Sequence, residues 1–261
     1  MSTALITGAT EGIGLEFARV FAADGWDLAI VARDRQRLDE TAAELRATGR
    51  TVSTFAFDLS LDGAARSLFD AVQAAALRID ALVNNAGIAT HGRFVDIASA
   101  DELAMLHLNV VALTELTKLF LPLMVERGAG NVLMLASTSA FQPGPYMAAY
   151  YATKSYVLSL AEALEVELAG TGVRITALCP GATHTGFTRR AKMTGETRLF
   201  RYNAMDARRV ALAGYRGMRA GRSIVIPGAI NNVLAFVVRI SPRRIVSRVV
   251  GWLNKVPGAR P

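Results

Sequence analysis

The stretch Thr3-Ala-Leu-Ile-Thr-Gly-Ala-Thr-Glu-Gly-Ile-Gly14 joins a short apolar run to a glycine-rich turn. The run predicts a buried strand, and the apolar residues from Ile13 to Phe21 recur at the spacing of a helix. A glycine-rich turn between a strand and a helix lets backbone N–H groups and the helix N-terminus face a phosphate. Glycine turns are common, so it is the position of this turn, directly after the first strand, that favours a phosphate site.

Further apolar runs of strand length alternate with amphipathic helical patterns along the chain. We predict strands over residues 3–7, 27–32, 51–57, 79–83, 131–136, 173–179 and 222–226. We predict helices over residues 35–48, 62–77, 101–126 and 150–169. Strands that alternate with helices at this spacing indicate an α/β fold, in which a parallel sheet is covered by helices on both faces. Ligands of such sheets bind at the C-terminal ends of the strands.

The length of the chain favours one large domain over residues 1–261. Hydrophobic residues make up 52% of the chain and charged residues 20%, which is typical of a well-filled globular core. The single cysteine, Cys179, excludes an intrachain disulfide and fits a reducing compartment. The first residues lack the pattern of a cleaved signal peptide, so we expect a cytoplasmic protein.

Charge is distributed unevenly along the chain. Residues 187–261 hold 16 Lys and Arg against two acidic residues, whereas residues 1–186 are net negative. This asymmetry indicates an acidic partner for the C-terminal quarter. The candidates are a cofactor phosphate, an anionic membrane surface, nucleic acid and the acidic body of the chain itself.

Arg33 stands just past the end of the second predicted strand, with Arg35 and Arg37 close behind it. In a βαβ nucleotide site this position lies near the adenosine ribose, where an acidic residue binds the 2′-hydroxyl and an arginine accommodates a 2′-phosphate. The sequence therefore favours NADP(H) and leaves NAD(H) open. The alternative is that the three arginines form a solvated helix start. Glu11 argues weakly against NADP(H), because its negative charge lies near the same site.

Tyr150 and Lys154 lie four residues apart in a predicted helix, so they share one face. A nearby cation stabilises a phenolate and lowers the pKa of the phenol, which suits a general acid/base acting on an alcohol or ketone. Ser137 follows the fifth strand and could hydrogen-bond the same substrate oxygen. A Tyr-x-x-x-Lys pair is common by chance, but its convergence with other strand-end residues favours a catalytic role.

Taken together, these motifs resemble the short-chain dehydrogenase/reductase family over residues 3–186. The resemblance is carried by Thr7-Gly-Ala-Thr-Glu-Gly-Ile-Gly14, Asp58-Leu59, Asn84-Asn-Ala-Gly87, Asn109, Ser137, Tyr150-x-x-x-Lys154 and Pro180-Gly181. It implies a doubly wound, mainly parallel, seven-stranded Rossmann-type sheet and a nicotinamide cofactor. It also implies that Tyr150 exchanges the proton of the substrate oxygen and that Ser137 orients that oxygen.

The resemblance assigns further roles residue by residue. Lys154 is expected to bind the nicotinamide ribose and to lower the pKa of Tyr150, and Asn109 to hold a water that links Lys154 to solvent. The expected cofactor-binding residues are Gly8, Thr10, Glu11, Gly12, Ile13, Gly14, Arg33, Asp58, Leu59, Asn84, Ala86, Gly87, Tyr150, Lys154, Pro180, Gly181, Thr183 and Thr185.

The pattern is less standard after Thr185. The resemblance makes residues 187–222 the substrate lid, and the chain continues as a basic amphipathic extension over residues 228–261. Within the second of its two expected helices, the sequence places Ile245, Val249 and Trp252 on one side and arginines on another. Such helices pack on the body or on another subunit, and the alternative is peripheral contact with a membrane.

The sequence thus predicts an NADP(H)-dependent reductase of ketones or aldehydes, with an apolar substrate such as a steroid-like, fatty acyl or aromatic carbonyl compound. The alternatives are an NAD-dependent dehydrogenase of secondary alcohols and a non-catalytic module that senses the nucleotide. The resemblance implies a homodimer or homotetramer that pairs through helices 101–126 and 150–169. No metal site is predicted, because the histidines lack ligand spacing, and no nucleic-acid motif is present.

Overall fold

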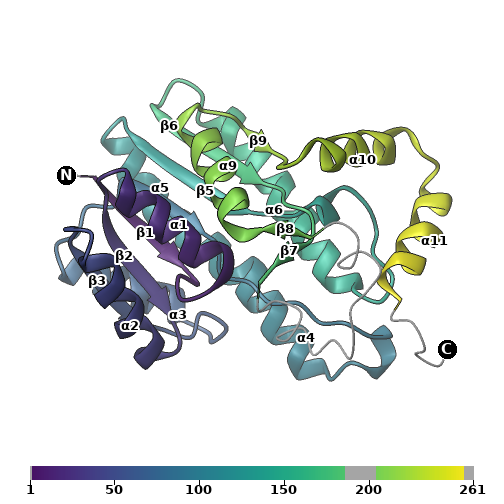
Figure 1. The fold of residues 1–261 in the computed structure, drawn as a ribbon, viewed down its shortest axis with the longest axis horizontal. Coiled ribbons are helices and arrows are strands. Elements are labelled where there is room, and N and C mark those ends of the chain that lie inside the picture. Colours follow the sequence, from purple (N-terminus) through teal and green to yellow (C-terminus); the bar gives the residue numbers. More distant parts are fainter. Residues whose placement is uncertain (1, 186–203, 256–261) are drawn as a thin grey trace.

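A computed structural model describes residues 2–185 and 204–255 of the chain, and its centre is a seven-stranded parallel sheet (Figure 1). The strands lie in the order β3-β2-β1-β4-β5-β6-β9. They are β1 (Thr3–Thr7), β2 (Asp27–Ala32), β3 (Val52–Ala56), β4 (Ala81–Asn84), β5 (Gly130–Leu135), β6 (Val173–Leu178) and β9 (Ile224–Val225). The order reverses beside β1, which pairs with both β2 and β4, so a crevice opens there at the strand ends.

Helices cover both faces of this sheet, as the alternating pattern predicts. The helices of the sheet layers and the following connections are α1 (Gly12–Ala23), α2 (Arg35–Arg46), α3 (Ala64–Ala74), α4 (Ser99–Leu106), α5 (Leu113–Glu126), α6 (Ala148–Glu167) and α9 (Ala207–Arg219). Shorter elements are η1 (Phe94–Asp96), η2 (His107–Ala112), η3 (Thr138–Phe141), β7 (Thr183–His184) and β8 (Met205–Asp206). The doubly wound fold class is confirmed.

Two clusters of buried hydrophobic side chains fill the space between the sheet and the helices on its two faces. On one face, Phe17 and Phe21 of α1 pack with Tyr215 of α9 and with alternate residues of the strands. On the other face, Phe120 of α5 and Val157 of α6 pack with the intervening strand residues. Because every residue of the central strand β1 is buried, the sheet is a rigid support for the loops at its C-terminal edge.

The helix expected over residues 101–126 is longer than predicted and contains a wider turn. It runs from Ser99 to Glu126, and its middle section, η2, is a π-helix that carries Asn109. By length and composition alone, this is the one helix in the described chain that could cross a membrane. It packs instead against β4, β5 and α3, which is the position of a core helix in a sheet protein.

The predicted lid, residues 187–222, lies partly outside the described chain, and its role stays a prediction. Residues 186–203 lie outside the described chain, but α9 packs against α1 in a helix layer, because its apolar face, which includes Val210 and Met218, is buried there. Residues 207–219 are therefore part of the body.

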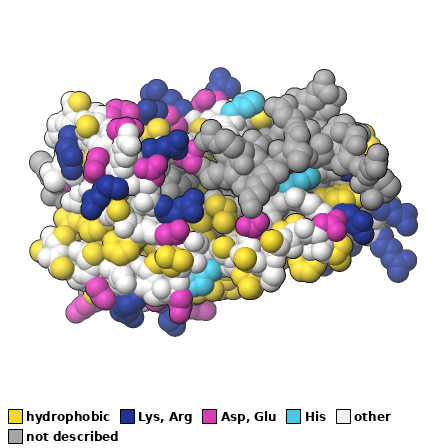
Figure 2. Space-filling model, turned by 90° about the horizontal axis from the view of Figure 1, so that it is seen from below, with side chains coloured by type: hydrophobic (Ala, Val, Ile, Leu, Met, Phe, Trp, Pro, Cys, Tyr) yellow, Lys and Arg dark blue, Asp and Glu magenta, His cyan; other side chains and the backbone are white. Residues whose placement is uncertain are grey.

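The C-terminal extension forms two helices, α10 (Ala229–Ile240) and α11 (Arg243–Asn254). They stand at the opposite end of the molecule from β3 (Figure 1), and Lys and Arg side chains project from that end (Figure 2). The stripe of α11 that packs inward is Val246 and Val250. Ile245, Val249 and Trp252, which the sequence placed on one side, are exposed, because two apolar stripes share this helix.

Candidate active site

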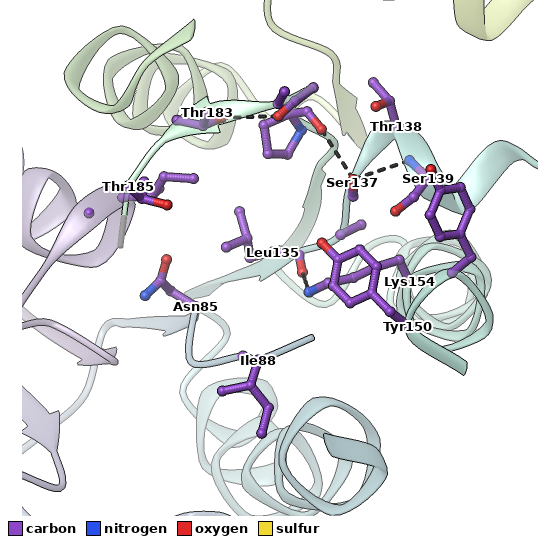
Figure 3. Close-up of a pocket in the computed structure, with 18 of the residues that line it drawn as sticks. Asn85, Ile88, Leu135, Ser137, Thr138, Ser139, Tyr150, Lys154, Thr183 and Thr185 are labelled. Atoms are coloured by element: carbon purple, nitrogen blue, oxygen red, sulfur yellow. Dashed lines mark hydrogen bonds between the residues drawn. The ribbon is translucent and has the colours of Figure 1, made fainter. Parts of the chain in front are cut away.

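A cavity of about 680 Å³ lies at the C-terminal edge of the sheet. Its walls come from the turns after β1, β2, β3, β4, β5 and β6 and from helices α6, α10 and α11. Figure 3 shows Thr183 and Thr185, Asn85, Ser137, Tyr150 and Lys154 around one space, although they come from distant parts of the chain. The volume is of the size that holds a small-molecule ligand or cofactor.

The glycine-rich turn forms one end of the cavity. Gly8 and Gly12 have φ angles of +67° and +57°, which glycine adopts without strain. A Cβ atom on Gly14 would lie 2.1 Å from the carbonyl oxygen of Gly8, so only glycine fits where α1 meets the turn. The backbone N–H groups at the start of α1 thus reach the cavity, and this cradle fits the phosphates of a dinucleotide.

Asn85 and Thr7 hold this turn in place, and sequence reasoning gave neither of them a role of its own. The Asn85 side chain donates to the carbonyl oxygens of Thr7 at 2.8 Å and Gly8 at 3.2 Å. The Thr7 hydroxyl oxygen accepts from the backbone N–H groups of Asn85 and Ala86. The second asparagine of the Asn-Asn-Ala-Gly motif therefore ties the β4 turn to the glycine turn.

Arg33 and Arg37 line the next part of the cavity with two carboxylates, Asp34 and Asp58. The Arg33 guanidinium is 3.6 Å from the Asp58 carboxylate, and both groups are partly exposed to solvent. Burial pushes the pKa of Asp58 up, but hydrogen bonds from Ser60 and the charge of Arg33 outweigh it, so the net pKa is lowered. Asp58 is thus an anion at neutral pH, and Arg33 extends beyond it as a cation on the cavity wall.

Ser137 stands two residues past the end of β5. Its hydroxyl donates to the carbonyl oxygen of Pro180 at 3.3 Å and accepts from the N–H of Ser139 at 3.1 Å. These contacts fix the serine oxygen at the cavity wall. Figure 3 shows the Ser137 hydroxyl and the Tyr150 ring on the same side of the cavity.

Tyr150 and Lys154 lie one turn apart near the start of α6. The Lys154 Nζ is 5.8 Å from the centre of the Tyr150 ring and donates to the carbonyl oxygen of Leu135 at 2.7 Å. Burial lowers the pKa of Lys154 to about 8. Burial also raises the pKa of Tyr150, and the nearby Ser137 side chain offsets this only in part.

In this arrangement of protein groups, burial is the main influence on the pKa of Tyr150, and the lowering of that pKa by Lys154 beside a bound cofactor stays a prediction. The ammonium is directed to the end of β5 and not to the phenol oxygen, and removal of the phenol from water is the larger effect. Tyr150 carries its proton at neutral pH. In this state it is ready to act as an acid.

Two predicted site residues, Asn84 and Asn109, lie behind the cavity wall and not on it. Asn84 donates to the hydroxyl of Thr117 on α5, because its side chain points into the helix layer. Asn84 thus links the sheet to the helix layer, and its expected support of the cofactor stays a prediction.

Both polar atoms of the Asn109 side chain form hydrogen bonds with the backbone of Ile88. Its Oδ1 accepts from the Ile88 N–H at 3.0 Å, and its Nδ2 donates to the Ile88 carbonyl at 2.9 Å. A Cβ on Gly87 would lie 3.2 Å from this Oδ1 and 3.7 Å from the Lys154 Nζ, so Asn109 and Lys154 flank the same glycine. These bonds fix the π-helical turn beside Lys154, and the water relay assigned to Asn109 stays a prediction.

The remaining predicted cofactor residues all lie on the cavity wall. They are Gly8, Thr10, Glu11, Gly12, Ile13, Gly14, Arg33, Asp58, Leu59, Ala86, Gly87, Tyr150, Lys154, Pro180, Gly181, Thr183 and Thr185. Their binding roles stay predictions, but the structure brings them together.

The other end of the cavity is built by the C-terminal helices, which the sequence did not place there. The apolar side chains at this end are Met147, Leu234, Val237, Val238, Ile245, Val246, Val249, Val250 and Leu253. The Asn254 side chain, 1% exposed, holds α11 in place. It donates to the Pro145 carbonyl at 3.1 Å and exchanges a hydrogen bond with the Tyr151 hydroxyl. The only signal in the sequence was the spacing of Val246, Val250 and Asn254, which recurs every four residues.

The family of the chain follows from comparison with known proteins. Residues 2–195 match the family model described as short chain dehydrogenase. The sulfoacetaldehyde reductase 2 of Chromohalobacter salexigens is 39% identical over 186 residues, which are 70% of this chain and 73% of that protein. The ketoacyl reductase HetN of Nostoc sp. is 34% identical over 187 residues, which are 71% of this chain but 65% of HetN.

Solved structures extend the likeness over nearly the whole chain. A short-chain dehydrogenase from Sphingobium yanoikuyae in complex with NADPH has a TM-score of 0.81 at 32% identity and covers 93% of this chain and 97% of its own. A short-chain dehydrogenase/reductase from Burkholderia phymatum in complex with NAD has a TM-score of 0.82 at 26% identity, with 92% of each chain covered.

The chain belongs to the short-chain dehydrogenase/reductase family and is an oxidoreductase. Its fold is the one that binds NAD(P)(H) in this family.

Proposed function

We propose that this protein reduces an apolar ketone or aldehyde to an alcohol with NADP(H). The observation that carries the proposal is the shared cavity, which brings Ser137, Tyr150 and Lys154 to one side and the glycine turn and Arg33 to the other. A non-catalytic protein that only binds the nucleotide would need the glycine turn. It would not need a buried proton donor such as Tyr150 close to the Ser137 hydroxyl.

The preference for NADP(H) over NAD(H) rests on two cations. Arg33 follows β2, the position near the adenosine ribose in a βαβ site, and Arg37 lines the same wall one turn into α2. A 2′-phosphate would accept charge-assisted hydrogen bonds from these guanidinium groups. Asp58 holds Arg33 toward the cavity and also reduces the positive charge there. Relatives in complex with NADPH and with NAD are both known, so the cofactor preference is part of the proposal.

In the proposed reaction, a bound nicotinamide supplies the hydride that the carbonyl carbon accepts. Tyr150 donates its hydroxyl proton to the carbonyl oxygen, which becomes the alcohol. Ser137 donates a hydrogen bond to the same oxygen by turning its hydroxyl proton away from the Pro180 carbonyl. The Tyr150 phenol is protonated at neutral pH, so it has a proton to donate to the carbonyl oxygen.

Lys154 supports this step as a cation close to the reacting oxygen. Its pKa of about 8 leaves it mostly protonated at neutral pH. In the proposed complex its ammonium binds ribose hydroxyls and stabilises the phenolate that Tyr150 becomes after proton transfer. Asn109 fixes the π-helical turn beside it, and we propose that a water held there returns a proton from solvent.

The apolar substrate follows from the end of the cavity that α10 and α11 build. Within the described chain, the charged residues on the cavity wall are Glu11, Arg33, Asp34, Arg37, Asp58 and Lys154, and none of them comes from the C-terminal helices. An aliphatic wall of this kind gains most from burying hydrocarbon and repels a charged group that it cannot pair. A steroid-like, fatty acyl or aromatic carbonyl compound fits this wall.

We also propose a homodimer or homotetramer that pairs through the helix from Ser99 to Glu126 and through α6. Leu103 and Val166 are 61% and 72% exposed on these helices, and Tyr156 hydrogen-bonds Thr114 between them. Light scattering on the purified protein checks this assignment, and a monomeric mass at micromolar concentration would remove it.

The test of the function is cofactor consumption by the purified protein. NADPH and NADH are offered separately with ketones and aldehydes of increasing apolar size. We expect NADPH to be consumed faster, with kcat/KM rising with the apolar size of the carbonyl compound. Faster turnover with NAD and a secondary alcohol would replace the proposal with the oxidative alternative. Tight binding of NADPH without turnover of any compound would indicate a module that senses the nucleotide.

A further inference from the structure

The C-terminal helices expose nine large apolar side chains within the described chain. We call the surface that they form the tail face. Its members are the exposed apolar side chains Ile230, Val233, Leu234, Phe236, Val237 and Ile240 on α10 and Ile245, Val249 and Trp252 on α11. Ile240, Phe236 and Trp252 are 71%, 63% and 59% exposed. Large apolar side chains gathered in one patch mark an interaction surface more often than scattered ones do.

Within the described residues, the charged side chains that α10 and α11 place beside the tail face are all positive. Arg239, Arg243, Arg244 and Arg248 are exposed on the same two helices, and none of them forms an ion pair within the described residues. The chain contains no Asp or Glu after Asp206. Lys and Arg side chains are seen projecting from this end of the molecule beside hydrophobic ones (Figure 2). An apolar surface with a cationic border complements an anionic lipid surface.

The same charges disfavour a second copy of the chain as the occupant of this surface. A two-fold contact through the tail face would set the four arginines of one copy near those of the other. The helices that carry them have no carboxylate to pair with these arginines. The surface proposed for oligomer formation, on the helix from Ser99 to Glu126, carries both signs of charge, with Glu115, Lys118 and Glu126 in α5.

The inner side of the same helices is the apolar end of the cavity. Leu234, Val237, Ile245 and Val249 are exposed and also line the cavity, so they form a rim between the cavity and the tail face. The Asn254 bonds to Pro145 and Tyr151 hold α11, and with it this rim, at a fixed place beside α6.

We propose that the tail face docks on an anionic lipid membrane, and that a lipid-soluble carbonyl substrate enters the cavity from the membrane across this rim. The second part rests on the proposed function, and the first part does not. The apolar side chains of α10 and α11 enter the boundary between headgroups and acyl chains, and the arginines contact anionic headgroups.

The first experiment is co-sedimentation of the full chain with vesicles, which needs no enzyme activity. The probes are vesicles of phosphatidylcholine alone and vesicles of equal parts phosphatidylcholine and phosphatidylserine. We expect binding to the anionic vesicles that weakens with added salt. The variant Arg243→Gln/Arg244→Gln/Arg248→Gln should bind at least about tenfold more weakly, because each arginine near an anionic surface contributes on its own.

The matched control is Arg208→Gln/Arg209→Gln/Arg222→Gln, which removes the same charge from exposed positions of the body. It should bind nearly as well as the natural sequence. Phe236→Ser and Trp252→Ser should each weaken binding without a change in charge. Equal binding by all of these variants, or no binding of the natural sequence to anionic vesicles, would overturn the proposal. So would a dimer in light scattering that Trp252→Ser converts to a monomer, because the tail face would then be a protein interface.

The second experiment separates substrate entry from catalysis. NADPH consumption is measured with a water-soluble carbonyl compound and with a long-chain one dissolved in the anionic vesicles. The arginine variant should keep its kcat/KM for the soluble compound and lose about tenfold for the compound in vesicles. An equal loss for both would overturn the route from the membrane. Absence of turnover with both compounds in the natural protein would count against the proposed function and leave the docking result standing.

Discussion

The two ends of the cavity are built by different means. At the nucleotide end, strand ends and one glycine turn bring backbone N–H groups and charges together, and a Cβ on Gly14 would lie 2.1 Å from a backbone oxygen. At the substrate end, α10 and α11 supply aliphatic side chains that are held by packing and by Asn254. The shape of the nucleotide end depends on a backbone conformation that few residues other than glycine can adopt. The shape of the substrate end depends on apolar side chains that other apolar side chains could replace. Changes at the first end should therefore alter chemistry, and changes at the second end should alter substrate affinity.

The largest effect is expected for Tyr150→Phe. Loss of the hydroxyl proton should lower kcat by about 10²–10⁴-fold, the usual contribution of a general acid, with little change in NADPH affinity. The adjacent Tyr151→Phe is a matched control, because the Tyr151 hydroxyl bonds Asn254 and not Ser137. Steady-state rates and calorimetric NADPH binding measure both. A Tyr150→Phe enzyme within about threefold of the natural kcat would remove the assigned role.

A smaller effect is expected for Arg33→Asp, which tests the nucleotide end alone. The change removes charge-assisted hydrogen bonds to a 2′-phosphate, which contribute about 1.5–3 kcal/mol, and it adds a repulsive charge. The ratio of kcat/KM for NADPH over NADH should fall by about 10–100-fold. Arg35→Asp is the control, since Arg35 does not line the cavity. An unchanged ratio in Arg33→Asp would place the discrimination elsewhere.

A change of about tenfold is expected from pH. The pKa of Lys154 is lowered to about 8, so the ammonium is present below that pH and is lost above it. The kcat/KM for NADPH, which reports the free enzyme, should fall about tenfold per pH unit once the pH exceeds about 8. Lys154→Met should be slower throughout and should show no such fall. A profile that stays flat to pH 10 in the natural protein would contradict a role for the Lys154 charge.

The smallest effect is expected for Asn254→Leu, which loosens the substrate end. Each lost hydrogen bond contributes about 1 kcal/mol, so KM for an apolar ketone should rise about fivefold while kcat and NADPH affinity are kept. The double variant Tyr151→Phe/Asn254→Leu should lose less than the two single variants together, because it removes the Tyr151 hydroxyl that Asn254→Leu alone leaves without its partner. Strictly additive losses in thermal unfolding and in KM would show that this pair does not hold α11.

The same contrast explains what the sequence could predict. The strands were predictable because their apolar runs end at a polar residue, a glycine or a proline, and Gly8, Arg33, Ser137 and their neighbours could be placed at one sheet edge from their order alone. The Tyr150 pKa was not predictable, because it depends on the direction of the Lys154 ammonium and on burial, which no spacing encodes.

Two further features escaped prediction for physical reasons. The π-helical turn at Asn109 depends on paired hydrogen bonds to Ile88, 21 residues away in the chain, so the local pattern could not show it. On α11, two apolar stripes recur at helical spacing, and only contact with the body decides that Val246 and not Ile245 is buried. Tertiary contacts, and not local propensity, settled both cases.

The central claim is that this cavity transfers a hydride from NADPH to an apolar carbonyl carbon. The most direct measurement uses NADPH deuterated at the transferable position of the nicotinamide, with an apolar ketone and the purified full chain. The account predicts an alcohol with one deuterium on the former carbonyl carbon, at a rate that Tyr150→Phe lowers by about 10²–10⁴-fold. Tight binding of NADPH with no deuterium in any alcohol product would contradict it.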